Sequence, residues 1–330
     1  MTAPIPVVLD VDTGVDDACA LLLAALHPGL DLRAVTCVGG NAPLVDVVRN
    51  TLTVLATAGA VEVPVAAGAD RPLLEHPHDA RHVHGADGMA DLGRAAPDLA
   101  PDERHAVGLL RDVITEQAAA GAPVTLVPLA PMTNLALLAR THPDAFAALG
   151  RIVFMGGGAQ VSNATASAEF NVFHDPEAAA VVLDACVELE VPVTMYGLDV
   201  FYRPTVTRAQ AEALLAADDG TGPASLAGGL IRFMCDRFGA DEATIGDAGA
   251  VAAVLAPDAV TTARLPVRVE LAGTWTRGRT IVDLRGTAAD LDHDPHGLAP
   301  ALVDVALDID AERVAALWLA TVAGPGAGSA

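Results

Sequence analysis

The chain has 330 residues and a formal net charge of −23, and all nineteen of its basic residues are arginine. We therefore expect no nucleic acid as partner, because binding to phosphates depends on Lys and Arg. The absence of lysine also excludes a P-loop, a Schiff-base lysine and a lysine general base. The acidic, lysine-free composition is typical of a GC-rich genome, with salt adaptation as the second explanation.

Strands and helices alternate along most of the chain. Strands are predicted at 5–10, 32–38, 63–67, 124–128, 151–155 and 192–196, and again at 267–271, 279–284 and 301–307. Helices are predicted at 16–27, 43–58, 104–120, 132–140, 176–188, 207–239 (broken near 220–223), 247–255 and 310–320. This alternation predicts an α/β fold with a mostly parallel, Rossmann-like central sheet flanked by helices, and the last three strands predict a small antiparallel addition.

Length and composition bound the organisation. We expect one domain over residues 1–322, with an aliphatic core because only 3% of residues are aromatic, and a disordered Gly/Ala tail over 323–330. The four cysteines are scattered without a CxxC pair, which favours a reduced, cytoplasmic protein. No signal peptide and no apolar run of about 20 residues is evident, so we expect no membrane partner.

Residues 68–103 interrupt the alternation. This stretch is rich in Gly, Pro and Asp and holds four of the ten histidines, namely His76, His78, His82 and His84. We predict a long loop over the carboxyl edge of the sheet, in the position of a lid. The spacing of His76 and His78 does not indicate a zinc site.

Four carboxylates lie within eight residues where the first strand meets the first helix. Asp10 and Asp12 share one side of an extended chain, and Asp16 and Asp17 open the helix. A helix cap alone would account for Asp16 and Asp17. However, four carboxylates repel one another unless a cation lies among them, and no arginine occurs before Arg33. Oxygen ligands alone indicate a hard cation, Ca²⁺ or Mg²⁺. Adjacent helical residues diverge by roughly 100°, so we expect only one of Asp16 and Asp17 to bind the ion.

Two enzyme classes begin with a strand followed by Asp-x-Asp. A haloacid dehalogenase-type phosphatase normally needs a later lysine or arginine for the phosphoryl group and a downstream acidic pair. Here there is no lysine, and the doubled aspartate follows four residues after the Asp-x-Asp. We therefore set the phosphatase aside.

The run Asp10-Val-Asp-Thr-Gly-Val-Asp-Asp-Ala18 resembles the opening of the inosine–uridine nucleoside hydrolases. The likeness continues in order over roughly residues 5–285. It includes Val38–Asn41, Val83–Gly88, Leu129–Asn134, Met155–Gly158, Asn163–Asn171, Gly197–Asp199 and Thr276–Thr280. The resemblance implies an N-ribohydrolase that cleaves ribonucleosides to ribose and free base, with Ca²⁺ as cofactor and a homodimer or homotetramer as the assembly.

The resemblance also implies roles at the metal. Asp12 would bind Ca²⁺ and activate the water on the ion, and Asp17 would be a bidentate ligand. Asp247 and the main-chain carbonyl of Leu129 would complete the ligand set. Asp10 would support these groups from behind.

For the ribose, the resemblance implies a set of hydroxyl-binding side chains. Amides and carboxylates together provide the donors and acceptors that ribose needs. The set is Asp16, Asn41, Asn163, Glu169, Asn171 and Asp247.

The pattern departs from the family just before Asp247. Many members carry His-Asp-Pro there, and the purine-specific branch has an aromatic residue, whereas this chain has Gly246. His84, in the Val83–Gly88 motif, becomes the catalytic candidate that protonates the leaving group. His82, Tyr202, Arg237 and Phe238 are weaker candidates. The alternatives are a hydrolase of another N-ribosyl compound on the same scaffold and a non-catalytic, calcium-dependent ribose- or nucleoside-binding protein.

Overall fold

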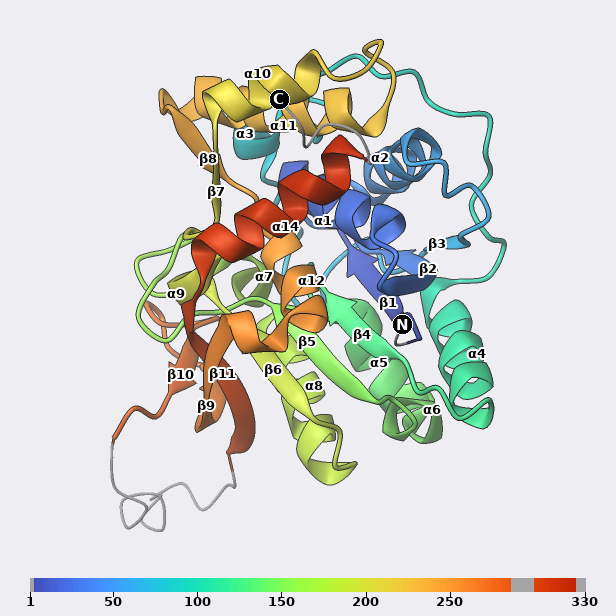
Figure 1. Cartoon of the computed structure of the whole chain (residues 1–330). Coiled ribbons are helices and arrows are strands. Elements are labelled where there is room, and N and C mark those ends of the chain that lie inside the picture. Colours follow the sequence, from blue (N-terminus) through green and yellow to red (C-terminus); the bar gives the residue numbers. More distant parts are fainter. Residues whose placement is uncertain (1–2, 286–299, 325–330) are drawn as a thin grey trace.

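The fold is built on one mostly parallel sheet with helices on both faces (Figure 1). The structure is a computed structural model that describes residues 3–285 and 300–324. Within these residues the sheet has nine strands, in the spatial order β10 (Thr280–Val282), β9 (Val260–Val269), β11 (Ala301–Ile309), β6 (Val193–Tyr196), β5 (Arg151–Met155), β4 (Thr125–Pro128), β1 (Ile5–Val11), β2 (Leu30–Cys37) and β3 (Val65–Ala67). The strands from β11 to β3 are parallel, and β9 and β10 add to them antiparallel. The predicted α/β fold with an antiparallel addition is confirmed.

Alternation along the strands divides the core into two layers. In β1, Val7, Leu9 and Val11 belong to the apolar cluster on one face of the sheet, and Val8 belongs to the cluster on the other. The first face is covered by α1 (Val15–Leu26), α2 (Leu44–Thr57), α11 (Pro223–Phe238), α12 (Ala248–Leu255) and α14 (Ala311–Ala323). The second is covered by α4 (Ala106–Ala119), α5 (Thr133–Thr141), α6 (Pro143–Ala147) and α8 (Pro176–Glu188).

The order of the strands predicts a ligand site at the carboxyl ends of β1 and β4. From β1 the chain proceeds outward through β2 and β3, and then it returns to the other side of β1 with β4, β5 and β6. The connections therefore diverge between β1 and β4. In open parallel sheets, ligands bind beyond the carboxyl ends of the strands at such a switch point. Asp10 and Asp12 lie at this end of β1, and Leu129 follows β4.

Several short elements escaped prediction. They are α3 (Arg81–His84), α6, α7 (Phe170–His174), α9 (Leu198–Phe201), the 3₁₀ turn η1 (Pro257–Ala259), and a second, two-stranded antiparallel sheet of β7 (Thr205–Thr207) and β8 (Glu242–Thr244). The segment expected as one broken helix contains α10 (Arg208–Leu215) and α11. Strand β9 begins at Val260, seven residues before the predicted start, and continues through Pro266.

The C-terminal helix is longer than predicted. Helix α14 continues to Ala323, so the expected tail at 323–330 overlaps its last residue, and residues 325–330 lie outside the described part of the chain. Trp318 anchors α14 to α1, because its indole N–H donates to the Cys19 carbonyl at 2.9 Å. Across residues 3–285 and 300–324 no helix has the length and apolar character needed to cross a membrane.

Candidate active site

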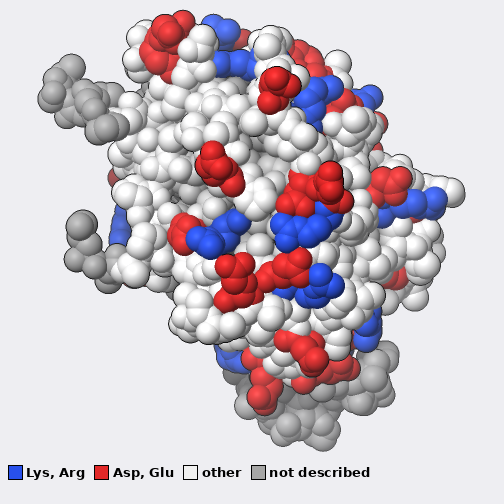
Figure 2. Space-filling model, turned by 90° about the vertical axis from the view of Figure 1, so that its right-hand side faces the viewer, with Lys and Arg blue, Asp and Glu red and all other residues white. Residues whose placement is uncertain are grey.

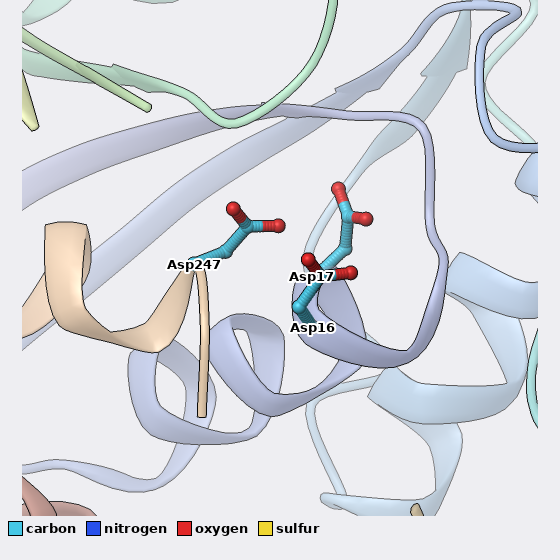
Figure 3. Close-up of side chains that lie close together, drawn as sticks. All are labelled: Asp16, Asp17 and Asp247. Carbon is cyan, nitrogen blue, oxygen red and sulfur yellow. The ribbon is translucent and has the colours of Figure 1, made fainter. Parts of the chain in front are cut away.

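Three carboxylates from two helices meet at the switch point. Asp16 and Asp17 open α1, and Asp247 precedes α12; one carboxylate oxygen from each lies within 4.8 Å of the other two (Figure 3). Helices α1 and α12 pack against each other, so residues 230 positions apart in sequence reach one place. Asp17 and Asp247 are buried, and Asp16 is partly exposed. This is the geometry of a cation site built from oxygen ligands.

Asp16 and Asp17 come closer together than the divergence of adjacent helical residues predicts. Asp17 turns back to cap its own helix, where its carboxylate accepts the amide hydrogens of Asp12 at 3.1 Å and Gly14 at 2.9 Å. Its oxygens thereby come close to those of Asp16 although the two Cα–Cβ bonds point apart. The assignment of Asp16 to the ribose rather than to the ion stays a prediction.

Asp12 lies against this cluster and is held by one residue. Its carboxylate accepts the Asn41 amide hydrogen at 2.7 Å and the Asn41 side-chain amide at 3.1 Å. The same side-chain nitrogen also donates to Asp17 at 3.2 Å. A Cβ added at Gly40 would overlap the Asp12 carboxylate, so only glycine fits there. The turn Gly40-Asn41 thus fixes Asp12 beside Asp17.

Asp10 is fully buried and is held by side chains from two other elements, and its supporting role stays a prediction. Its carboxylate accepts hydrogen bonds from the Thr36 hydroxyl and from the Asn134 side chain, the latter at 2.8 Å. Asn134 also donates to the Cys37 carbonyl and accepts from the Ala69 amide. The sequence predicted no role for Thr36 or Asn134. The signal for Asn134 was its place in the Leu129–Asn134 motif.

Burial raises the pKa of every carboxyl group in this region whose shift is resolved. The pKa of Asp10 rises to about 7 because of burial, although Thr36 and Asn134 oppose the rise. The pKa of Asp17 also rises to about 7, through burial and then through the charge of Asp16. Burial and neighbouring carboxylates raise the pKa values of Asp12 and Asp247 well above their usual range. A cation among these groups would reverse the shifts.

The segment that opens α7 supplies a second group of predicted site residues. Glu169 caps α7 and accepts the amide hydrogens of Gly157 at 2.8 Å, Asn171 at 2.8 Å and Val172 at 3.1 Å. Burial raises its pKa to about 7 despite these bonds. The Asn171 side-chain amide donates to the Leu129 carbonyl at 2.8 Å, which ties this segment to the end of β4. The predicted residues Leu129, Glu169 and Asn171 therefore adjoin one another.

The glycine-rich loop after β5 is clamped by two residues from distant segments. Asp199 accepts the Ala159 and Gln160 amides at 2.6 and 3.0 Å. The Thr280 hydroxyl accepts from the Gly158 amide at 2.9 Å and donates to the Gly158 carbonyl at 2.8 Å. Both residues lie in the family motifs, at Gly197–Asp199 and Thr276–Thr280, and the structure gives them a positioning role that the sequence did not reveal.

Asn163 is exposed, and its side chain binds two residues from other segments. Its side-chain oxygen accepts the Phe170 amide hydrogen at 2.9 Å, and its side-chain nitrogen donates to the Tyr202 hydroxyl at 3.4 Å. The charges of Asp16 and Glu169 contribute to the raised pKa of Tyr202, after burial as the main cause. Tyr202 is therefore joined by a hydrogen bond to one of the predicted ribose residues, Asn163.

His84 reaches the site from α3 in the long loop. Its ring is buried, its Nδ1 accepts the Val15 amide hydrogen at 3.1 Å, and Nδ1 lies 3.7 Å from an Asp16 oxygen. In the neutral imidazole the hydrogen is therefore on Nε2. Burial lowers the pKa of His84, although Asp16 opposes the shift, so the neutral form prevails at pH 7.

The weaker candidates are placed differently. Tyr202 adjoins the site through Asn163, whereas His82 is exposed beside His84. Arg237 and Phe238 end α11 and are also exposed. The ring of His78 lies against Phe173 and the buried His174, 5.4 and 6.4 Å away between ring centroids.

Comparison with known proteins agrees with this geometry. The family model for the inosine-uridine preferring nucleoside hydrolases matches residues 7–316. The inosine-uridine preferring nucleoside hydrolase of Crithidia fasciculata is 37% identical over 295 residues, which are 88% of this chain and 91% of that protein. The pyrimidine-specific ribonucleoside hydrolase RihA of Photobacterium profundum is 36% identical over 84% of this chain and 88% of that protein.

A solved structure shows the same fold throughout. A plant nucleoside hydrolase superimposes with a TM-score of 0.87 at 29% identity, covering 98% of this chain and all of the other. The protein is therefore a ribonucleoside hydrolase that cleaves the N-glycosidic bond, and it belongs to the inosine-uridine preferring nucleoside hydrolase family.

Proposed function

We propose that the hydrolase depends on Ca²⁺ held by Asp12, Asp17, Asp247 and the Leu129 carbonyl. The observation that carries this proposal is the convergence of Asp16, Asp17 and Asp247 within 4.8 Å. Bound calcium would lower the pKa of a water molecule beside the anomeric carbon. The remaining chemistry falls to the side chains of this chain.

The residues fit a hard cation. Buried oxygens of Asp16 and Asp247 have no hydrogen-bond partner among the described residues, as expected of atoms that a ligand completes. The donor set consists of oxygen atoms, which favours Ca²⁺ or Mg²⁺ over a soft metal. The Leu129 carbonyl accepts one hydrogen bond from Asn171, which leaves its second lone pair for the ion.

We assign the base for the attacking water to Asp12. Asn41 holds this carboxylate with two hydrogen bonds, so it is oriented before substrate arrives. Asp12 would take a proton as the water attacks the anomeric carbon. The carboxylates that line the ribose would stabilise the positive charge that develops on the sugar as the base departs. The side chains that would bind the ribose hydroxyls are Asp16, Asn41, Asn163, Glu169, Asn171 and Asp247.

His84 remains our proposed donor to the leaving group. Because Nδ1 is occupied by the Val15 amide, Nε2 is the atom that would donate. A neutral imidazole is a weak proton donor, so we expect its contribution to be modest.

The preference for a particular base is set on the side of the site that meets the leaving group. Relatives include an inosine-uridine preferring enzyme and a pyrimidine-specific enzyme. A compound other than a standard nucleoside remains the alternative substrate, since Gly246 replaces the usual residue. Substrate panels must therefore include inosine, uridine, cytidine, adenosine and other N-ribosides.

The test is ribose release by protein freed of metal with a chelator. We expect no activity without metal, recovery on adding Ca²⁺, and less recovery with Mg²⁺. Full activity in excess chelator would overturn the calcium proposal. Recovery by Zn²⁺ alone would overturn the assignment of a hard cation.

We further propose that the protein acts in the cytoplasm as a homodimer or homotetramer on small molecules. Its acidic surface supports a small-molecule partner rather than nucleic acid. Arginines pair with carboxylates, as in Arg104–Asp102 and Arg49–Asp46, both at 2.7 Å. In the view of Figure 2, basic groups lie beside acidic ones rather than in a continuous basic patch. Light scattering coupled to size exclusion would measure the assembly, and a monomer would contradict it.

A further inference from the structure

The wall beside Asp247 has no room for a side chain at position 246. Gly246 has φ +52°, a conformation that L side chains rarely adopt. A Cβ added there would lie 2.6 Å from the Asp16 Cβ and 2.9 Å from the Phe201 ring. Both contacts are closer than real Cβ atoms show. The base of a nucleoside must therefore meet some other residue on this wall.

Phe201 fills the space that a side chain at 246 would need. Its ring is buried, with 5% of the residue exposed. The Thr244 hydroxyl locks the arrangement, since it donates to the Phe201 carbonyl at 2.7 Å and accepts the Gly246 amide hydrogen at 3.0 Å. Gly246, Thr244 and Phe201 therefore pack together as one unit. The residue that follows Phe201 in the chain forms the exposed surface of this unit.

That next residue, Tyr202, lies at the exposed edge of the site, where it is hydrogen-bonded to Asn163. Its ring packs edge-on against Phe201, with centroids 5.0 Å apart at 88°, and 46% of the residue is exposed. Its hydroxyl accepts a hydrogen bond from Asn163, so the hydroxyl hydrogen remains free to donate. Burial, and then the charges of Asp16 and Glu169, raise the pKa of Tyr202, so the hydroxyl stays protonated at neutral pH.

We propose that Tyr202 is the specificity residue for the leaving group: its ring contacts the base, and its hydroxyl donates a hydrogen bond to a ring nitrogen or carbonyl oxygen of the base. This rests on the proposed position of the ribose among Asp16, Asn163 and Glu169. A ribose placed there directs its anomeric substituent toward the wall of Phe201 and Tyr202. The hydrogen bond strengthens as the N-glycosidic bond breaks, because electrons of that bond pass to the base.

The variant Tyr202→Phe tests the proposal, since it keeps the ring and removes only the hydroxyl. For inosine and uridine we expect kcat/KM to fall about tenfold, the value of one good hydrogen bond. For p-nitrophenyl riboside, whose leaving group needs little stabilisation, the fall should be clearly smaller. Inhibition by free ribose should be unchanged.

Two results would overturn the proposal. Equal losses on the nucleosides and the aryl riboside would show that the hydroxyl does not act on the base. A matching loss of ribose inhibition would show that Tyr202 binds the sugar. The second variant, Tyr202→Leu, removes the ring, and an unchanged KM for nucleosides would exclude the contact of the ring with the base. Chelation of the wild-type enzyme tests the calcium proposal separately, because these ratios are measured in saturating Ca²⁺.

Discussion

The two sides of this candidate active site are built in different ways. On the metal and ribose side, Asp12, Asp17 and Glu169 are almost fully buried, and each is held by two or more hydrogen bonds from neighbouring backbone or side-chain groups. On the base side, a glycine and a buried phenylalanine form the wall, and the polar groups that face the substrate are few. In the function that we propose, the first side binds the constant part of the substrate, the ribose, and the second meets the variable part, the base.

The metal and ribose side carries an electrostatic cost that the base side does not. Burying several carboxylates together is unfavourable unless a cation joins them, so in the function that we propose the metal side depends on its ion for charge balance. The base side needs no such ion, because its wall is apolar. Experiments on the ion and on Asp12 should therefore have much larger effects than experiments on the base side.

Calcium removal should give the largest effect, and its size should depend on pH. The folded-state pKa of Asp17 is raised to about 7 from an ordinary value near 4. Its protonated form therefore stabilises the metal-free protein at pH 4, and this contribution is lost as the pH rises through 7. We expect activity to fall to background in chelator and the gain in Tm on adding Ca²⁺ to be greater at pH 8 than at pH 5.

Thermal unfolding in chelator and in excess Ca²⁺ at several pH values measures this. A gain in Tm that is constant with pH, or larger at pH 5, would contradict a site whose carboxylates exchange protons for the ion.

Asp12→Asn comes next in size. The substitution keeps the shape of the side chain but removes the base and one negative charge, so kcat should fall about a thousandfold. The metal-free variant should unfold at a higher temperature than the metal-free wild type, because one repelling carboxylate is gone. Asp258→Asn is the control, since Asp258 lies on the surface and pairs with Arg313 at 2.8 Å. Activity within tenfold of wild type would remove Asp12 from the role of base.

Gly246→Ala should act through backbone strain and a clash. The matched control is Gly239→Ala, because Gly239 has φ +63° but nothing within 4 Å of an added Cβ. We expect the control to lower the free energy of unfolding by about 1 kcal/mol and Gly246→Ala by about 2–3 kcal/mol. Gly246→Ala should also lower kcat/KM by displacing Asp16. Equal losses of stability in the two variants would show that Phe201 and Asp16 can move away from the added methyl group at no cost in free energy.

The same contrast decides how much the sequence could predict. Asp12, Asp16, Asp17 and Asn41 could be singled out because they lie in short motifs that follow the first two strands, whereas Asp247 could be singled out only through the family resemblance; their roles stay predictions. The parallel sheet followed from the alternation of strands and helices, which is a local pattern. The identity of the wall opposite the base was not recognisable in this way. Its defining fact, the Phe201 ring in the space beside Gly246, joins two apolar residues 45 positions apart in sequence.

Short elements were missed for a related reason. Helices α7 and α9 have five and four residues, so they show no helical period, and they are held by tertiary contacts such as the Glu169 cap. Likewise, the part of Thr36 and Asn134 in holding Asp10 depends on β2 and α5 lying beside β1. No spacing in the sequence carries that information.

His84→Ala should have the smallest effect of these changes and should sharpen the contrast within the base side. Because the Val15 amide occupies Nδ1 and burial lowers the pKa of the imidazole, only the neutral Nε2–H can donate at pH 7. A neutral donor contributes a hydrogen bond rather than a full proton, so we expect kcat/KM for inosine to fall by roughly three- to tenfold. The loss for p-nitrophenyl riboside should be smaller.

The exposed neighbour His82 provides the control, and His82→Ala should leave both rates unchanged. If His84→Ala lowers kcat/KM by the same factor for inosine and for p-nitrophenyl riboside, then His84 acts by holding the first turn of α1. There its ring accepts the Val15 amide hydrogen beside Asp16. In that case Tyr202, and not His84, is the hydrogen-bond donor to the leaving group. The double variant His84→Ala/Tyr202→Phe adds a further check. If both side chains donate to the base, the combined loss of kcat/KM is larger on inosine than on the aryl riboside by both factors, whereas a His84 that only holds α1 adds the same factor on both substrates.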